Sequence, residues 1–269
     1  MSLICVSSPK GGVGKTTIAA NLASRLAASG LRVVAIDLDP QNSLRLHFGV
    51  PLGDRGGFMC MLPNLPDWRR IGVQTPAGVH LLPYGRQPLS EAMNTSAHLM
   101  QKPELLAQPV REMLDDPATV VIVDTAPGMS PALLALLPFT DLMLTILLAD
   151  PISISQIPGV DAGDIYGQIN DSQSSGANGD RIGFVINQFD LRSRLGPSLV
   201  RSARAYLGER LLGTIVRDEN VTEAVAAQKS LAEYSTGSKA SQDINDLAGL
   251  LASRLDMHAA TRSRLKVSA

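Results

Sequence analysis

Short apolar runs recur along the chain, and several of them end at an aspartate or an asparagine. The runs are rich in Val, Ile and Leu and lack the alternation of a strand that has one face in water. This pattern is typical of parallel strands that are buried on both faces of a sheet. The strands are predicted at 3–6, 31–37, 79–85, 119–124, 141–148, 181–187 and 211–218.

Segments with helical spacing separate these runs. Helices are predicted at 18–28, within 91–116, at 221–228 and at 240–255, and Pro103 suits a helix start. The stretch 49–66 is rich in Gly and Pro and is predicted to be loop or broken helix, and the Ser/Gly/Asn-rich stretch 172–180 a surface loop. Strands that alternate with helices indicate an α/β domain with a mostly parallel, twisted sheet and helices on both faces.

The stretch between the first strand and the first helix predicts a phosphate site. It reads Ser-Ser-Pro-Lys-Gly-Gly-Val-Gly-Lys-Thr-Thr from residue 7 to residue 17. Its glycines allow positive φ and let backbone N–H groups approach an anion, and the helix that follows adds its positive dipole end. Lys15 is placed to reach the β- and γ-phosphates, and the Thr16 hydroxyl to bind Mg²⁺. The predicted nucleotide-binding residues here are Gly11, Gly12, Val13, Gly14, Lys15, Thr16 and Thr17.

Carboxylates follow two of the predicted strands. Asp37 and Asp39 end the second strand, in the segment Asp-Leu-Asp-Pro-Gln, and Asp124 ends the strand at 119–124. The carboxyl ends of parallel strands form the ligand-binding edge of an α/β sheet. An acidic residue that ends an apolar strand is the Walker B arrangement, in which Asp124 would hold Mg²⁺ through water. The plainer interpretation of Asp37 and Asp39 is a pair of solvated turn carboxylates before Pro40.

The glycine loop departs from the general P-loop pattern, because Pro9 stands where a glycine is usual and Lys10 follows it. This deviant form, Lys-Gly-Gly-Val-Gly-Lys-Thr, resembles the ParA/MinD group of ATPases. The resemblance implies a single three-layer P-loop NTPase domain that binds ATP and Mg²⁺ and hydrolyses ATP slowly, as a switch. It also implies a homodimer that sandwiches ATP, in which Lys10 reaches the nucleotide of the partner chain.

The same resemblance assigns further residues. It places Asp37 near the Mg²⁺ shell and makes Asp39 the residue that positions or polarises the attacking water. It carries the adenine-reading asparagine to Asn187, at the end of the strand 181–187, and a base-packing residue to Arg217. Val216 stands where the family has proline, so this sequence departs from the family at the Arg217 loop. The implied catalytic residues are thus Lys10, Lys15 and Asp39, and the implied metal site is Thr16, Asp37 and Asp124, the carboxylates acting through water.

A narrower resemblance rests on short stretches. Residues 42–48 with 67–69, and 217–220 through 232–234, resemble the BcsQ (YhjQ) branch of cellulose biosynthesis proteins. That branch implies a role in assembling or placing a cellulose secretion complex, with a small partner subunit. Proteins of the branch often lose the Asp-Pro-Gln segment, whereas this chain keeps Asp39, Pro40 and Gln41.

Bulk properties exclude several function classes. The 269 residues carry a formal net charge of −1, so no global field draws the protein to nucleic acid or acidic lipid. The four histidines show no metal-ligand spacing, and two cysteines make no disulfide framework. With no signal peptide or membrane-span pattern, we expect a cytoplasmic protein that reaches the inner membrane only through partners. The expected division is an ATPase domain at 1–257 and a short basic, disordered tail at 258–269.

Three other hypotheses stay open at this stage. A ParA-type partition protein would bind DNA non-specifically in its ATP-bound dimer, through arginines that neutralise phosphates. The candidates are Arg192, Arg194, Arg201, Arg204 and Arg210, although a solvated surface explains them as well. A MinD-like membrane binder needs a terminal amphipathic helix, and the basic tail has few bulky apolar residues. If Asp39 does not act, the protein is a nucleotide-binding module without hydrolysis.

Overall fold

A computed structural model describes residues 2–51, 53–62, 67–167 and 181–267, with side chains up to Arg254. The predicted surface loop at 172–180 lies outside these residues. Within the described part of the chain, no helix is both long and apolar enough to cross a membrane.

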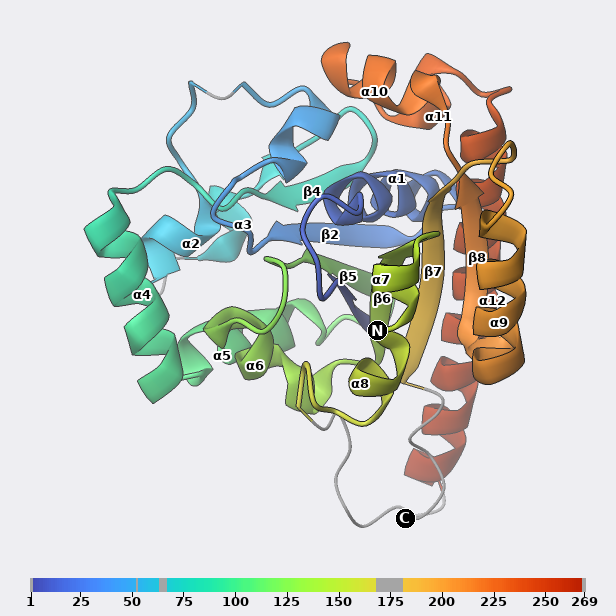
Figure 1. Cartoon of the computed structure of the whole chain (residues 1–269). Helices are drawn as coiled ribbons and strands as arrows, with labels where there is room; N and C mark the ends of the chain where they lie inside the picture. Colours follow the sequence, from blue (N-terminus) through green and yellow to red (C-terminus); the bar gives the residue numbers. More distant parts are fainter. Residues whose placement is uncertain (1, 52, 63–66, 168–180, 268–269) are drawn as a thin grey trace.

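The centre of the fold is an eight-stranded sheet in the order β3-β4-β2-β5-β1-β6-β7-β8 (Figure 1). All pairs are parallel except the short edge pair β3–β4. The sequence missed β3 but located the other strands, and the mostly parallel α/β prediction is confirmed. The strands are β1 (Ser2–Ser7), β2 (Arg32–Asp37), β3 (Val73–Gln74), β4 (Val79–Leu82), β5 (Thr119–Asp124), β6 (Leu142–Leu148), β7 (Ile182–Phe189) and β8 (Leu211–Val216).

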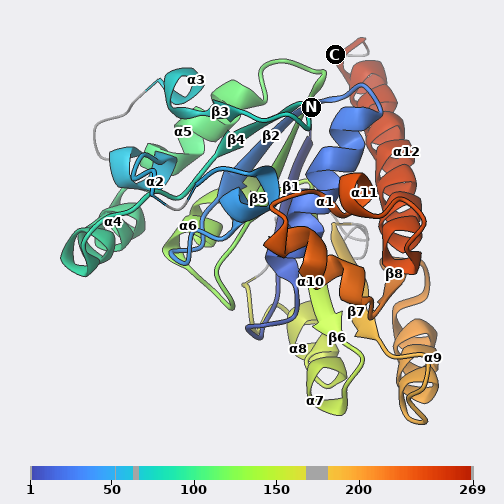
Figure 2. The same cartoon turned by 90° about the horizontal axis from the view of Figure 1, so that it is seen from above.

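Helices cover both faces of the sheet, as Figure 2 shows. One face packs against α1 (Lys15–Ala28) and the N-terminal part of α12 (Lys239–Val267), with α10 (Glu219–Ala226) and α11 (Leu231–Tyr234) beside them. The other face packs against α5 (Glu104–Met113), α6 (Pro131–Leu136), α8 (Ile157–Asp161) and α9 (Gly196–Leu207), and α4 (Leu89–Gln101) packs outside them on α5 and α6, with Leu99 in the same core. Short elements lie between them: η1 (Leu44–Phe48), α2 (Phe58–Met61), α3 (Trp68–Ile71), η3 (Leu137–Phe139), α7 (Pro151–Ile154) and η4 (Gly208–Arg210).

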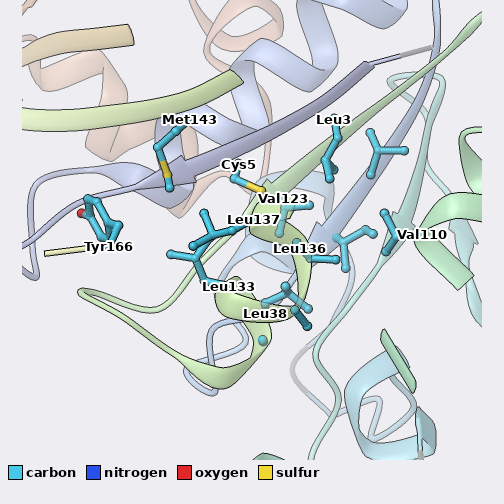
Figure 3. Close-up of a cluster of buried hydrophobic side chains, with 14 of the residues drawn as sticks. Leu3, Cys5, Leu38, Val110, Val123, Leu133, Leu136, Leu137, Met143 and Tyr166 are labelled. Atoms are coloured by element: carbon cyan, nitrogen blue, oxygen red, sulfur yellow. The ribbon is translucent and has the colours of Figure 1, made fainter. Parts of the chain in front are cut away.

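The central strand β1 divides its side chains between two hydrophobic clusters, because successive residues of a strand point to opposite faces. Leu3 and Cys5 enter the cluster on the α6 side, and Ile4 and Val6 enter the cluster on the α1 side. Figure 3 shows Leu3 and Cys5 in their cluster with Val123, Met143 and α6 residues. Burial on both faces explains why the sequence of this strand has no polar alternation.

The structure bears on the sequence expectation in two segments. The stretch 49–66, predicted as loop or broken helix, contains the four-residue helix α2, whose Phe58 and Met59 are buried in the core, and so agrees with a broken helix. The backbone of α12 is helical to Val267, so it continues through most of the segment 258–269 that was expected to be a disordered tail. The division into a domain at 1–257 and a tail stays a prediction.

One buried histidine makes the stability of the fold depend on pH. His47, in η1, is 5% exposed, and its Nδ1 has no hydrogen-bond partner among the described residues. Burial lowers the pKa of His47 to about 4, because the imidazolium loses its hydration. The folded protein therefore keeps this ring neutral, while the unfolded chain takes up a proton below about pH 6.5.

We predict that His47→Gln flattens the acid side of the stability profile. Between the two pKa values the unfolded state binds more protons, so the stability of the parent falls as the pH falls. Between pH 7 and pH 5, protonation of His47 in the unfolded chain lowers the free energy of unfolding of the parent by about 2 kcal/mol, and the variant does not lose this amount. Urea unfolding of both proteins at the two pH values measures how much free energy of unfolding each one loses. The carboxylates are the same in both proteins, so their contribution cancels when the two losses are compared. Equal losses in the two proteins would mean that His47 is not neutral and buried in the fold.

Candidate functional site

Three strand ends meet at one edge of the sheet. Asp37, the last residue of β2, is the register partner of Asp124, the last residue of β5, and Asp124 is also paired with Val6 of β1. The glycine loop leaves β1 directly beyond this point. The strand register therefore brings the two predicted carboxylates and the predicted phosphate cradle together at the carboxyl edge, as the sequence led us to expect.

The glycine loop has the backbone of an anion site. Gly12 and Gly14 have φ values of 75° and 92°, which disfavour any other residue. A Cβ at Gly14 would also lie 2.4 Å from Nδ2 of Asn187. Helix α1 begins at Lys15 with no side-chain cap and no acidic residue in its first turn. Its first N–H groups and its dipole are thus left for an external anion.

Asp124 is a buried acid that its surroundings compensate only in part. Asp124 is fully buried, and neither of its carboxylate oxygens has a hydrogen-bond partner of ordinary geometry among the described residues. Burial raises its pKa to about 7, opposed by the Thr16 hydroxyl and the Lys15 ammonium, while Asp39 adds to the rise. An orphaned carboxylate next to a threonine hydroxyl is the oxygen set that Mg²⁺ prefers. These residues therefore fit the predicted metal.

Lys15 is almost as enclosed as the acids, with 6% exposure. Burial lowers the pKa of Lys15, and the negative charges of Asp124 and Asp39 oppose that change. A cation held this close to carboxylates and to open backbone amides can bind a phosphate without first being desolvated.

Asp37 holds its own loop in place. Its two oxygens accept hydrogen bonds from the backbone amides of Asp39 and Leu44, each at 3.0 Å. Burial and the charge of Asp124 nevertheless raise the pKa of Asp37 well above its usual range. Each carboxylate oxygen keeps a second lone pair, which leaves room for a metal-bound water.

Asp39 lies at the start of a strained turn. It is 8% exposed, and its Oδ1 accepts the amide of Gln41 at 2.9 Å. Asn42 follows with φ 53°, a left-handed conformation that is uncommon outside glycine. The charge of Asp39 acts on Lys15, Asp37 and Asp124, which places it in the same electrostatic cluster.

Asn187 and Arg217 line one cavity of about 550 Å³ beside the glycine loop. The wall also includes Gly14, Thr17 and Val216. The Nδ2 of Asn187 donates to the carbonyl oxygen of Val13 at 2.8 Å, so the asparagine ties β7 to the loop. The cavity is large enough for a planar base next to the phosphate cradle, a size within the range of small-molecule sites.

Lys10 lies at the rim and has a partner that the sequence reasoning missed. Its Nζ is 3.7 Å from the carboxylate of Asp150, and both side chains are partly exposed. Asp150 follows β6 and precedes Pro151, so it repeats the strand-end Asp-Pro pattern of Asp39 and Pro40. That repetition was the signal that could have identified it.

A second missed residue is Gln188. It has φ 55°, and its Nε2 lies 3.5 Å from the carbonyl oxygen of Gly12. No pattern in the sequence marks a glutamine for this conformation.

Comparison with known proteins gives a family and a fold. The family model "Cellulose biosynthesis protein BcsQ" matches residues 1–250. The chain is similar to the cellulose biosynthesis protein BcsQ of Salmonella typhi, with 29% identity over 253 residues, which cover 92% of this chain and 93% of that protein. It is also similar to the chromosome-partitioning ATPase Soj of Thermus thermophilus, with 27% identity over 249 residues, 91% of this chain and 93% of that protein.

Solved structures share the architecture. The septum site-determining protein MinD of Pyrococcus horikoshii, complexed with Mg-ADP, aligns with a TM-score of 0.73 and 20% identity, covering 93% of this chain and 95% of that one. The ParA family ATPase of Chlorobium tepidum aligns with a TM-score of 0.72 and 17% identity, covering 92% of this chain and 98% of that one. The ParA/MinD-type fold is confirmed by these likenesses.

We predict that Asp124→Asn stabilises the nucleotide-free protein and removes its response to Mg-ATP. The amide eliminates a buried charge that faces Asp37 and that Thr16 and Lys15 compensate only in part. A gain of about 1 kcal/mol would raise the melting midpoint by about 2–4 °C. Thermal shift measurements without and with Mg-ATP test both parts, with the exposed Asp115→Asn as the control. A lower midpoint for Asp124→Asn would contradict the assignment of an unpartnered acid.

Proposed function

The chain belongs to the BcsQ family of cellulose biosynthesis proteins, and we propose that it is an ATP-dependent, dimerising ATPase switch that helps to assemble or localise a cellulose secretion complex. The same proposal gives it a homodimer, a small partner subunit and other components of the secretion machine as partners. It places the protein in the cytoplasm, in contact with the inner membrane only through those partners.

The observation that carries the nucleotide part is the orphaned Asp124 beside Lys15 and Thr16. A buried acid with no partner is costly unless a ligand compensates it. Thr16 and Asp124, with Asp37 behind them, would hold Mg²⁺, which when bound neutralises phosphate charge. The triphosphate would lie along the backbone amides of residues 11–17, with the base in the cavity of Asn187 and Arg217.

Hydrolysis is assigned to Asp39. Its Oδ2 is not used by the Gln41 bond, and its charge acts on the other site residues. A carboxylate in this position can orient a water and accept its proton, a step typically worth ~10²–10⁴-fold in rate. Lys15 contributes a fixed positive charge, which stabilises the negative charge that develops on the phosphate.

The dimer is assigned to Lys10. Its side chain is 45% exposed, and its ion-pair partner among the described residues is Asp150. An exposed pair of this kind contributes about 0–1 kcal/mol, so Lys10 can leave it at little cost. We propose that Lys10 then meets the phosphates bound by the partner chain, and that loss of the γ-phosphate removes part of that contact.

A partition ATPase that binds DNA in its ATP-bound dimer is the second candidate, which the similarity to Soj supports. Two of the five arginines proposed for DNA are neutralised within the fold. Arg192 pairs with Asp190 and Arg210 with Asp161. These pairs reduce the charge available to phosphates and favour the first candidate.

We predict that Asp39→Ala binds ATP like the parent and hydrolyses it roughly 10²–10⁴ times more slowly. The variant removes the group that orients water and leaves the phosphate cradle intact. Calorimetry measures the affinity and phosphate release measures the rate, with Lys15→Ala as the variant that we expect not to bind ATP. Hydrolysis at the parental rate in Asp39→Ala would assign the water to another residue.

We predict that Lys10→Ala weakens the ATP-bound dimer roughly 10–100-fold, while each monomer still binds ATP. Hydrogen bonds to charged groups contribute ~1.5–3 kcal/mol each, and the variant loses them across the interface. Analytical ultracentrifugation with a non-hydrolysed ATP analogue measures the dimer constant, and Lys229→Ala, another half-exposed lysine in an ion pair, is the control. Equal dimerisation of Lys10→Ala and the parent would contradict the ATP sandwich.

A further inference from the structure

Helix α4 carries a row of exposed apolar side chains. Leu89, Met93 and Met100 are 77%, 65% and 73% exposed, whereas only Thr95 and Leu99 of this helix are buried. At 100° per residue, the three exposed side chains fall within about 40° of one another on the helix surface. We call these three residues the α4 stripe. In both views α4 lies at the margin of the molecule, next to α2 and away from the sheet (Figures 1 and 2).

The α4 stripe is more than scattered surface hydrophobicity. Single exposed leucines are common, but aligned large apolar side chains on an otherwise polar helix mark an interaction site. Methionine is flexible and polarisable, and it is favoured on surfaces that adapt to a helical ligand. From Leu89 to Met100 the stripe is about 17 Å long, which matches about three turns of a partner helix.

An exposed cation flanks α4 at each end. Arg86 precedes Leu89 and Lys102 follows Met100, and both side chains are exposed. Among the described residues, no acidic side chain is paired with either of them. A second copy of this chain would bring cation against cation, whether the two α4 helices ran parallel or antiparallel. A helix with a carboxylate near each end complements both cations.

The stripe leads to a cavity that also contacts the loop of Asp39. This cavity of about 470 Å³ is lined by Arg86, Leu89 and Ala92 on one side and by Pro40, Gln41 and Asn42 on the other. The amide of Gly85 lies 3.4 Å from Oδ1 of Asn42, which joins the two sides. The amide of Gln41 is the one that holds Oδ1 of Asp39. A side chain inserted here would touch the turn that sets the position of Asp39.

We propose that the α4 stripe and this cavity form the docking surface for an amphipathic helix of a partner protein, which has an apolar row about three turns long and a carboxylate near each end. One apolar side chain of the partner fills the cavity beside Leu89 and changes the rate at which Asp39 supports hydrolysis. The rate effect rests on the proposed ATPase function, whereas the docking does not.

The test uses a display library of helical peptides about 16 residues long, which span the α4 stripe at 1.5 Å per residue, selected on the full-length protein. We expect the selected peptides to have an apolar row and terminal acidic residues, and to bind Leu89→Glu and Met93→Glu at least tenfold more weakly than the parent. Leu191→Glu, which alters a leucine of similar exposure away from α4, is the matched control and should bind normally. Arg86→Glu should weaken binding, and a peptide with its facing glutamate changed to lysine should restore it.

Each other outcome overturns a stated part of the proposal. Selected peptides that bind Leu89→Glu as tightly as the parent would exclude the stripe as the docking surface. Self-association of the parent without peptide, broken by Met93→Glu, would make a second copy the occupant. Saturating peptide that leaves the hydrolysis rate of the parent unchanged would overturn the coupling to Asp39. Lys15→Ala should still bind the peptide, so a failure of docking is distinguished from a failure of the ATPase proposal.

Discussion

The site depends on two aspartates that the sheet forces together. Asp37 and Asp124 end neighbouring strands in register, both are fully buried, and the charge of Asp124 helps to raise the pKa of Asp37. A fold that only needed stability would place apolar residues at these two positions, because burying like charges is unfavourable. Two backbone amides compensate Asp37, and Lys15 and Thr16 partly compensate Asp124. The remaining deficit is what a divalent cation and a polyphosphate together could supply, so the unfavourable burial favours the proposed ligand.

The topology makes this arrangement easy to encode in sequence. Strand β1 lies at the centre of the sheet between β5 and β6, so the glycine loop emerges next to the Asp124 end on one side and the Asp150 end on the other. Parallel strands all present their carboxyl ends at the same edge, and short loops are enough to bring residues that are far apart in the chain into contact. The amide of Gly128 donates to the carbonyl oxygen of Ser8 at 2.8 Å, which fastens the loop after β5 to the start of the glycine loop.

The sequence predicts those parts of the molecule that obey a local rule. Buried parallel strands have a recognisable composition, turns with positive φ favour glycine, and acids at strand ends are easily identified. The sheet, Gly14, Asp37 and Asp124 could therefore all be predicted from the sequence. Asp150 and Gln188 were missed because their roles arise from contacts with the glycine loop far away in the chain. The stretch around α2 could be predicted only as loop or broken helix, because its neighbours are glycine and proline, and tertiary burial of Phe58 decides for the helix. The exposure of the α4 stripe could not be predicted from the sequence either, since an apolar row on a helix normally predicts a buried face.

The two lysines of the glycine loop differ in exposure and in partners, as the proposed switch requires. Lys15 is buried among the carboxylates, and its position is fixed before any ligand arrives. Lys10 is half-exposed and has one weak partner at the rim among the residues that the structure describes. A ligand shifts a conformational equilibrium only by the difference between its contacts in the two states. In the proposed switch, contacts to Lys15 would be the same in both states and would add affinity without switching. Contacts to Lys10 would form only after it leaves Asp150, so they would supply the differential free energy, and the exposed ion pair sets the small amount that must be given up first.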